Sequence, residues 1–136
     1  FLVLNGLRDM SYKNLEIWKM SESLVIRIHI MTINDLPSFE MYEIGSQIRR
    51  SMKSVKANIV EGYGRKQSKK EYLQFLKIAL ASTIETTDHL ETLYKTGSLK
   101  DTDKYGSLFE DLDHLGKALR RFITAVQNDY RSTDSK

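Results

Sequence analysis

Apolar residues recur at spacings of three and four along most of the chain, which is the period of an amphipathic helix. Such stripes predict helices at about residues 14–33 and 39–60, a third from residue 68 to the glycine at 97, and a fourth from 101 to about 130. The positions expected to face the core are Ile17, Ser21, Leu24, Val25, Ile28 and Met31; Met41, Ile44, Ile48, Met52, Val55 and Ile59; Tyr72, Phe75, Leu76, Ala79, Thr83, Thr86, Leu90 and Leu93; and Tyr105, Leu108, Leu112, Leu115, Leu119, Phe122 and Val126.

Residues that stop or start helices lie between these stripes. Pro37 places a loop at residues 34–38, because proline and the residue before it resist helix. Gly62 to Gly64 is expected to end the second helix, and Gly97 the third, through the left-handed conformation that glycine accepts. Ser68 with Glu71 forms a capping box, and Asp101 is expected to cap the fourth helix.

Four helices joined mostly by short loops predict an all-α, antiparallel up-down four-helix bundle. The strict 3-4 repeat of the last helix is typical of left-handed packing. The bundle is expected to span residues 12–130 as one domain. Residues 1–11 are interpreted as a disordered or extended N-terminal extension, since Met10 is a more usual start, and residues 131–136 as a frayed tail.

Charged residues are distributed unevenly along the chain. The chain has 136 residues, one proline, no cysteine and a net charge of +3. The lack of cysteine favours a reducing, cytoplasmic location, and no apolar run is long enough to span a membrane. Residues 47–70 hold eight basic residues and one acidic residue, so the rest of the chain is net acidic. Such a local excess favours an anionic partner.

The basic segment is therefore the candidate nucleic-acid-binding surface. Lysine and arginine around one inter-helix turn can follow a phosphate backbone, and the binding would depend strongly on salt. A solvated helix face is the alternative interpretation. Base-specific contact is not expected, because no aromatic platform interleaves with these charges in the sequence. The residues expected to contact nucleic acid are Arg49, Lys53, Lys56, Arg65, Lys66, Lys69 and Lys70.

Two helices carry more apolar residues than one core face uses. Contiguous exposed apolar stripes usually mark interfaces, so self-association is expected. The alternative is that these are single exposed apolar residues, which are common and need no explanation. The expected oligomer interface consists of Ile26, Ile30 and Ile33 on the first helix and Leu73, Leu80 and Ile84 on the third.

A polar strip runs along the other flank of the second helix. Ser51, Ser54 and Asn58 form it, with Glu61 just beyond. No nucleophile, base and orienting group come together here, so Ser54, Asn58 and Glu61 are interpreted as structural hydrogen-bonding residues that fix helix register.

An enzyme is not expected. Helical bundles hold di-iron sites through inward Glu-x-x-His motifs, and neither His89 nor His114 stands in that pattern. The glycines at 62–64 lack the lysine-bearing pattern of a phosphate loop. No catalytic residue, metal, cofactor or small-molecule substrate is therefore predicted.

Several segments together resemble the four-helix-bundle proteins encoded in intervening sequences of bacterial 23S rRNA genes. They are Leu15 to Lys19, Ser46 to Ser51, Ser54 to Arg65 and Ser68 to Ser82. The resemblance implies a homo-oligomer, since related proteins form pentameric barrels of bundles. It also implies kinship with the accessory protein of diversity-generating retroelements, which binds a reverse transcriptase and nucleic acid through a basic surface.

The function expected from these observations is a homo-oligomer that binds nucleic acid, RNA foremost. The alternative is a protein-interaction scaffold whose basic surface docks another protein, such as a reverse transcriptase. One departure from the family pattern matters: Met52, Lys53 and Lys56 stand where the family often has small or uncharged residues, so this charge is particular to this chain.

Overall fold

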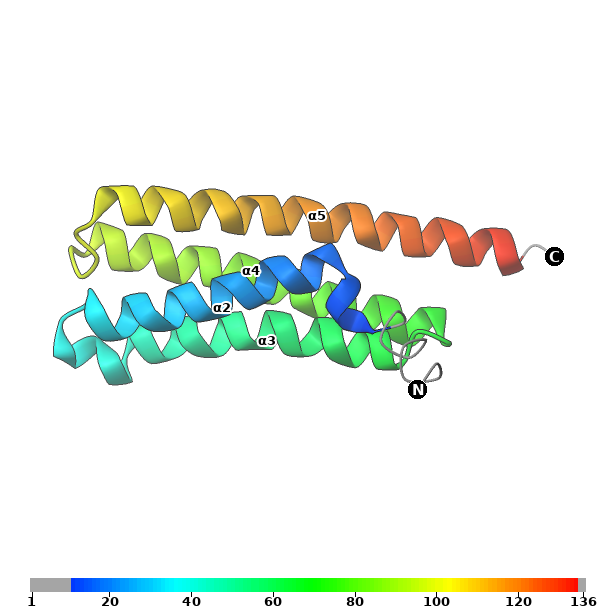
Figure 1. Cartoon of the computed structure of the whole chain (residues 1–136), viewed down its shortest axis with the longest axis horizontal. Helices are drawn as coiled ribbons and strands as arrows, with labels where there is room; N and C mark the ends of the chain where they lie inside the picture. Colours follow the sequence, from blue (N-terminus) through cyan, green and yellow to red (C-terminus); the bar gives the residue numbers. More distant parts are fainter. Residues whose placement is uncertain (1–10, 135–136) are drawn as a thin grey trace, which may run out of the picture.

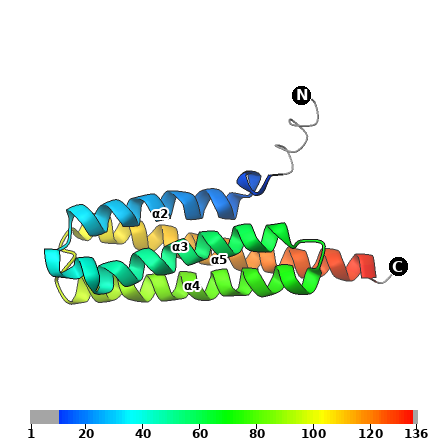
Figure 2. The same ribbon diagram turned by 90° about the horizontal axis from the view of Figure 1, so that it is seen from below.

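Four long helices make up the part of the chain that the computed structural model describes, residues 11–134, with side chains from 11 to 129. They are α2 (Glu16–Asn34), α3 (Ile44–Gly64), α4 (Lys69–Lys95) and α5 (Thr102–Asp134). Each helix runs antiparallel to the one before it, and α2 packs against α5 to close the bundle (Figures 1 and 2). The predicted all-α, up-down four-helix bundle is confirmed.

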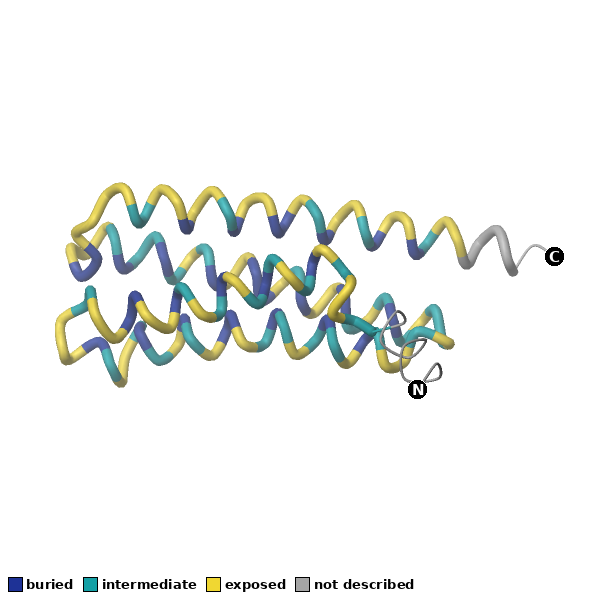
Figure 3. Tube along the Cα trace, viewed as in Figure 1, coloured by how far each residue is buried: buried dark blue, intermediate teal, exposed yellow. Residues whose placement is uncertain are grey.

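The core forms where the four apolar stripes meet, as the inward-facing buried positions in Figure 3 show. Leu24, Ile48, Leu76 and Leu112, one from each helix, are each at most 1% exposed. Most other predicted core positions are buried too. The exceptions are half-buried side chains at the edge of the core, namely Val25, Met41, Ile44, Phe75, Tyr105 and Phe122.

Three of the predicted helix ends are confirmed in atomic detail. The Glu71 N–H donates to Ser68 Oγ (3.2 Å) at the start of α4, and the Lys104 N–H donates to Asp101 Oδ1 (3.0 Å) near the start of α5. Gly97 has a φ of 81°, and just beyond it the Leu99 N–H donates to the Leu93 carbonyl (2.9 Å). Glycine is favoured at this left-handed position because it has no Cβ.

The predicted start of the second helix at Phe39 is wrong. A 3-10 helix, η2 (Ser38–Tyr42), comes first, and α3 begins at Ile44. Glu40 of η2 is only 3% exposed; its carboxylate accepts from the Ile44 N–H (3.2 Å) and from Ser98 Oγ (2.6 Å). The carboxylate thus caps α3 and joins it to the α4–α5 loop, which lies 58 residues away in sequence.

The second helix ends at Gly64, within the predicted glycine segment, but the left-handed ending expected there is wrong. α3 continues through Gly62 to Gly64, and neither glycine is left-handed. Gly62 is buried, and a Cβ there would lie 3.1 Å from Phe75 Cβ and 3.2 Å from Tyr72 Cδ1. This glycine therefore lets α4 approach α3 closely.

The two ends of the chain differ in how far the structure describes them. A short 3-10 helix, η1 (Tyr12–Asn14), precedes α2. The predicted N-terminal extension lies outside the described residues apart from Ser11. At the other end, α5 continues to Asp134, four residues past the boundary predicted at 130.

Ion pairs from distant parts of the chain join α2 to its neighbours. Arg27 Nη1 lies 2.6 Å from Asp111 Oδ2 of α5. Glu22 Oε1 lies 2.9 Å from Lys56 Nζ of α3. Asp35, the residue that ends α2, pairs with Lys104 of α5. The acidic and basic side chains are all partly exposed.

Candidate nucleic-acid interface

Arg49, predicted to bind nucleic acid, is a fold-stabilising residue in the structure. Its guanidinium is half-buried and donates to Thr32 Oγ1 (2.9 Å) and to the Met41 carbonyl (2.8 Å). These bonds hold η2 and α3 against the end of α2. The pattern along the second helix could not show this, because both acceptors belong to other elements.

Two other predicted cations, Lys56 and Arg65, form ion pairs with nearby carboxylates. Lys56 Nζ pairs with Glu22 and lies 5.8 Å from the centre of the Trp18 ring. Arg65 pairs with Glu61 (3.0 Å) and Glu71 (3.2 Å). The hydrogen bonds to Glu61 and then to Glu71 raise the pKa of the Arg65 guanidinium above its ordinary value, so it stays charged and paired.

The other four predicted cations make no ion pair with any described residue. Lys53 on α3 and Lys70 on α4 are exposed, and Lys66 and Lys69 are half-buried. We call these four the unpaired lysines. Lys66, Lys69 and Lys70 lie at the α3–α4 turn. Lys53 lies about three turns back along α3, and exposed Arg50, which also makes no ion pair with a described residue, lies about four turns back.

An aromatic cluster lies next to Lys66, contrary to the expectation from the sequence. Tyr12 contacts Trp18 edge-on (ring centroids 5.6 Å apart) and Tyr63 likewise (6.4 Å). Lys66 Nζ lies 4.0 Å from the centre of the Tyr63 ring. The cluster could not be predicted from the sequence, because η1 brings Tyr12 to Tyr63 of α3 from 51 residues away.

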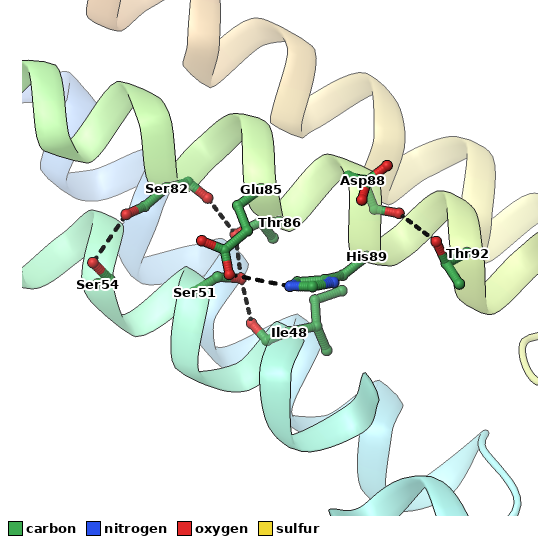
Figure 4. A network of polar contacts seen from close by, with 9 residues as sticks. All are labelled: Ile48, Ser51, Ser54, Ser82, Glu85, Thr86, Asp88, His89 and Thr92. Atoms are coloured by element: carbon green, nitrogen blue, oxygen red, sulfur yellow. Dashed lines mark hydrogen bonds and ion pairs between the residues drawn. The ribbon is translucent and has the colours of Figure 1, made fainter. Parts of the chain in front are cut away.

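The polar strip on α3 joins α3 to α4, as Figure 4 shows. Ser51 Oγ lies 2.7 Å from Thr86 Oγ1, and Ser54 Oγ lies 3.0 Å from Ser82 Oγ (Figure 4). Asn58 Nδ2 donates to the Ser54 carbonyl (2.8 Å) and to its Oγ (3.1 Å). These hydroxyl pairs tie the facing positions of the two helices together.

Glu61 stands apart from that strip. The sequence groups it with Ser54 and Asn58, but its carboxylate accepts from Arg65 on the exposed surface instead. Its structural role is thus an ion pair within the last turns of α3.

The apolar residues predicted for an oligomer interface fall into two classes. Ile26, Ile30, Ile33 and Ile84 are 49–55% exposed. Leu73 and Leu80 instead are half-buried and pack against the core, so α4 exposes less apolar surface than the pattern indicated, and their role in an interface stays a prediction.

A groove between α4 and α5 adjoins Ile84. Its walls include Ile84 and Phe109, and the polar groups at its rim include Asp88 and Arg120. Gly116 lines it as well, and a Cβ there would meet only Arg120 Nη1, at 3.8 Å. The groove encloses about 300 Å³. Sequence reasoning missed it, because Phe109 and Gly116 become neighbours of Ile84 only when α5 packs on α4.

Titratable residues do not gather into a metal site. Within residues 11–129, no group of three or more His, Cys, Asp or Glu side chains could hold an ion. His89 faces Glu85 (3.1 Å) as an exposed pair within α4. None of the described helices is long and apolar enough to cross a membrane.

Comparison with known proteins gives one family and one fold. Residues 13–121 match the model of a family described as the 23S rRNA-intervening sequence protein. The fold is similar to the crystal structure of a protein of unknown function from the S23 ribosomal protein family of Bacteroides thetaiotaomicron VPI-5482. The two share 28% identity with a TM-score of 0.69, over 79% of this chain and 95% of the other. No curated protein matches.

Proposed function

Because this chain belongs to the 23S rRNA-intervening sequence protein family, we propose that it is a non-enzymatic, cytoplasmic homo-oligomer that binds nucleic acid, RNA foremost, through the α3–α4 turn. One observation carries the proposal. The basic segment divides into cations that the fold engages, Arg49 through hydrogen bonds and Arg65 through ion pairs, and the unpaired lysines, which make no ion pair with a described residue.

The position of the lysines supports a ligand-binding role over a stabilising one. Lys69 and Lys70 occupy the first turn of α4, where free N–H groups already give a partial positive charge. Cations weaken a helix slightly at that end. A bound phosphate would interact favourably with the lysines and with the helix terminus together.

Charge reversal at this terminus tests the proposal cleanly. Lys69→Glu with Lys70→Glu should lower RNA affinity. The plot of the logarithm of affinity against the logarithm of salt concentration should also become less steep, by about one unit for each phosphate that the variant no longer binds. Glutamate favours a helix N-terminus, so unfolding would not explain the weaker binding. Affinity for structured RNA is measured across a salt series.

The matched control reverses the same charge at the other end of α4, with Lys95→Glu and Lys100→Glu. Lys95 lies in its last turn and Lys100 in the following loop, and both are exposed. Unchanged RNA binding is expected. If wild-type binding is absent or insensitive to salt, the proposal is wrong; if a protein partner captured on the basic surface survives nuclease treatment, the scaffold alternative replaces it.

Self-association forms the second part of the proposal. Ile26, Ile30 and Ile33 are exposed along α2, and we call this apolar stripe the ridge; the α4–α5 groove presents Ile84 and Phe109. A ridge on one element and a groove on another favour a head-to-tail contact between copies, which closes into a ring when the rotation allows it. The family resemblance implies a ring of five.

A further inference from the structure

The aromatic cluster and Lys66, one of the unpaired lysines, lie together where η1 meets the end of α3. Tyr12 and Tyr63 are half-buried, so part of each side chain remains accessible. Tyr63 carries the Lys66 ammonium over its ring face. We propose that this cluster stacks an unpaired base and that the nucleic acid bound at this surface is single-stranded. The inference rests on the proposed function and narrows it to one class of ligand.

The chemistry of the cluster distinguishes single strands from duplexes. Bases inside a duplex are covered on both faces by their neighbours, whereas an unpaired base offers a free face to an aromatic ring. Lys66 makes no ion pair with a described residue, so its ammonium can leave the Tyr63 ring without breaking one. It would then remain close enough to pair with the phosphate of the stacked nucleotide.

Both elements that form the cluster carry a further exposed lysine. Lys13 is exposed beside Tyr12 in η1. The side chains of Arg49 and Lys56 both contact α2, that of Lys56 through Glu22. Lys53 lies one turn from each of them, so it lies on the same side of α3. Ten residues of helix separate Lys53 from Tyr63, which is about 15 Å. Aromatic side chains on a positively charged surface are the arrangement that binds single strands without sequence preference.

The chain contains its own probe for this site. Trp18 is its only tryptophan, and it contacts Tyr12 directly. A base stacked on the cluster should therefore change the Trp18 emission. The experiment compares one unstructured RNA oligonucleotide, free and annealed to its complement, by anisotropy of a label on the RNA and by Trp18 emission of the full chain.

The single strand should bind more tightly and change the Trp18 emission, and the duplex should bind more weakly. Tyr63→Leu and, separately, Tyr12→Leu should lower single-strand affinity about 5- to 150-fold, the range for removal of one stacked base. Both variants should leave duplex affinity unchanged within about twofold, since only phosphate contacts remain there. Tyr63→Phe keeps the ring and should bind like the wild type.

The results distinguish failure of the base-stacking inference from failure of the proposed function. If neither RNA form binds, the proposed function fails. If the duplex binds as tightly as the single strand, or both leucine variants bind the single strand normally, only the base-stacking inference fails. Tyr12→Leu changes the short η1 helix outside the bundle core, so it remains decisive if circular dichroism shows that Tyr63→Leu loses helicity.

Discussion

At the scale of single residues, the buried carboxylate of Glu40 holds one end of the bundle together. Its two oxygens accept from an N–H at the start of α3 and from a hydroxyl in the α4–α5 loop. Arg49 makes the corresponding link to α2 through Thr32. A buried charge is costly unless it is hydrogen-bonded, so each of these partners matters for stability.

Ser98→Ala tests this link. The substitution removes the Ser98 hydroxyl donor and leaves one oxygen of a buried carboxylate without its partner, which should cost about 1.5–3 kcal/mol of unfolding free energy. Urea denaturation measures the change. Ser23→Ala on the exposed side of α2 is the control and should stay within about 0.5 kcal/mol. Equal stability of the two variants would contradict the role given to Glu40.

At the scale of helices, two glycines within regular helix have opposite roles. Gly62 admits α4, whereas no neighbouring atom lies within 4 Å of a Cβ built at Gly106 on α5. Gly106→Ala should therefore stabilise the protein by about 0.5–1 kcal/mol, because alanine loses less backbone freedom on folding. Gly62→Ala should destabilise it by about 1–3 kcal/mol through overpacking. Thermal unfolding of both variants should give shifts of opposite sign.

The helices themselves were predictable because their signals are local. The 3-4 spacing of Leu108, Leu112, Leu115 and Leu119 requires no knowledge of distant residues, and all four are buried. The same holds for caps whose partners lie three residues away, such as Ser68 with Glu71.

The candidate site was only partly predictable, for the converse reason. Which lysines remain unpaired depends on residues far away in sequence, such as Glu22 for Lys56. The aromatic cluster requires η1 to fold back on α3. The pattern of a single helix carries no information on either contact. The sequence therefore predicted the basic segment but not which of its cations remain unpaired.

At the scale of the whole molecule, the ridge and the groove lie on different elements, and this difference can be tested by mixing variants. Ile30→Gln disrupts the ridge and Ile84→Gln disrupts the groove, so each alone should reduce the mass seen by light scattering. Mixed together, the two variants should form dimers, because one intact ridge then meets one intact groove. If instead two copies joined through the same patch on each, mixing the two variants would not restore assembly.

Ile78→Gln is the control for this experiment. Ile78 is 40% exposed on α4 but does not line the groove, so the variant should assemble like the wild type. A monomeric wild-type protein would remove the basis for the proposed contact between copies.

The ion pairs around α2 have a consequence for any experiment that varies ionic strength. Exposed pairs such as Arg27 with Asp111 contribute about 0–1 kcal/mol each and weaken as salt rises, whereas the hydroxyl pairs between α3 and α4 carry no net charge. Added salt should therefore speed amide hydrogen exchange in α2 more than in α4. Part of any decrease in RNA affinity at high salt would then come from a loosened α2, with Trp18 emission changing even without RNA.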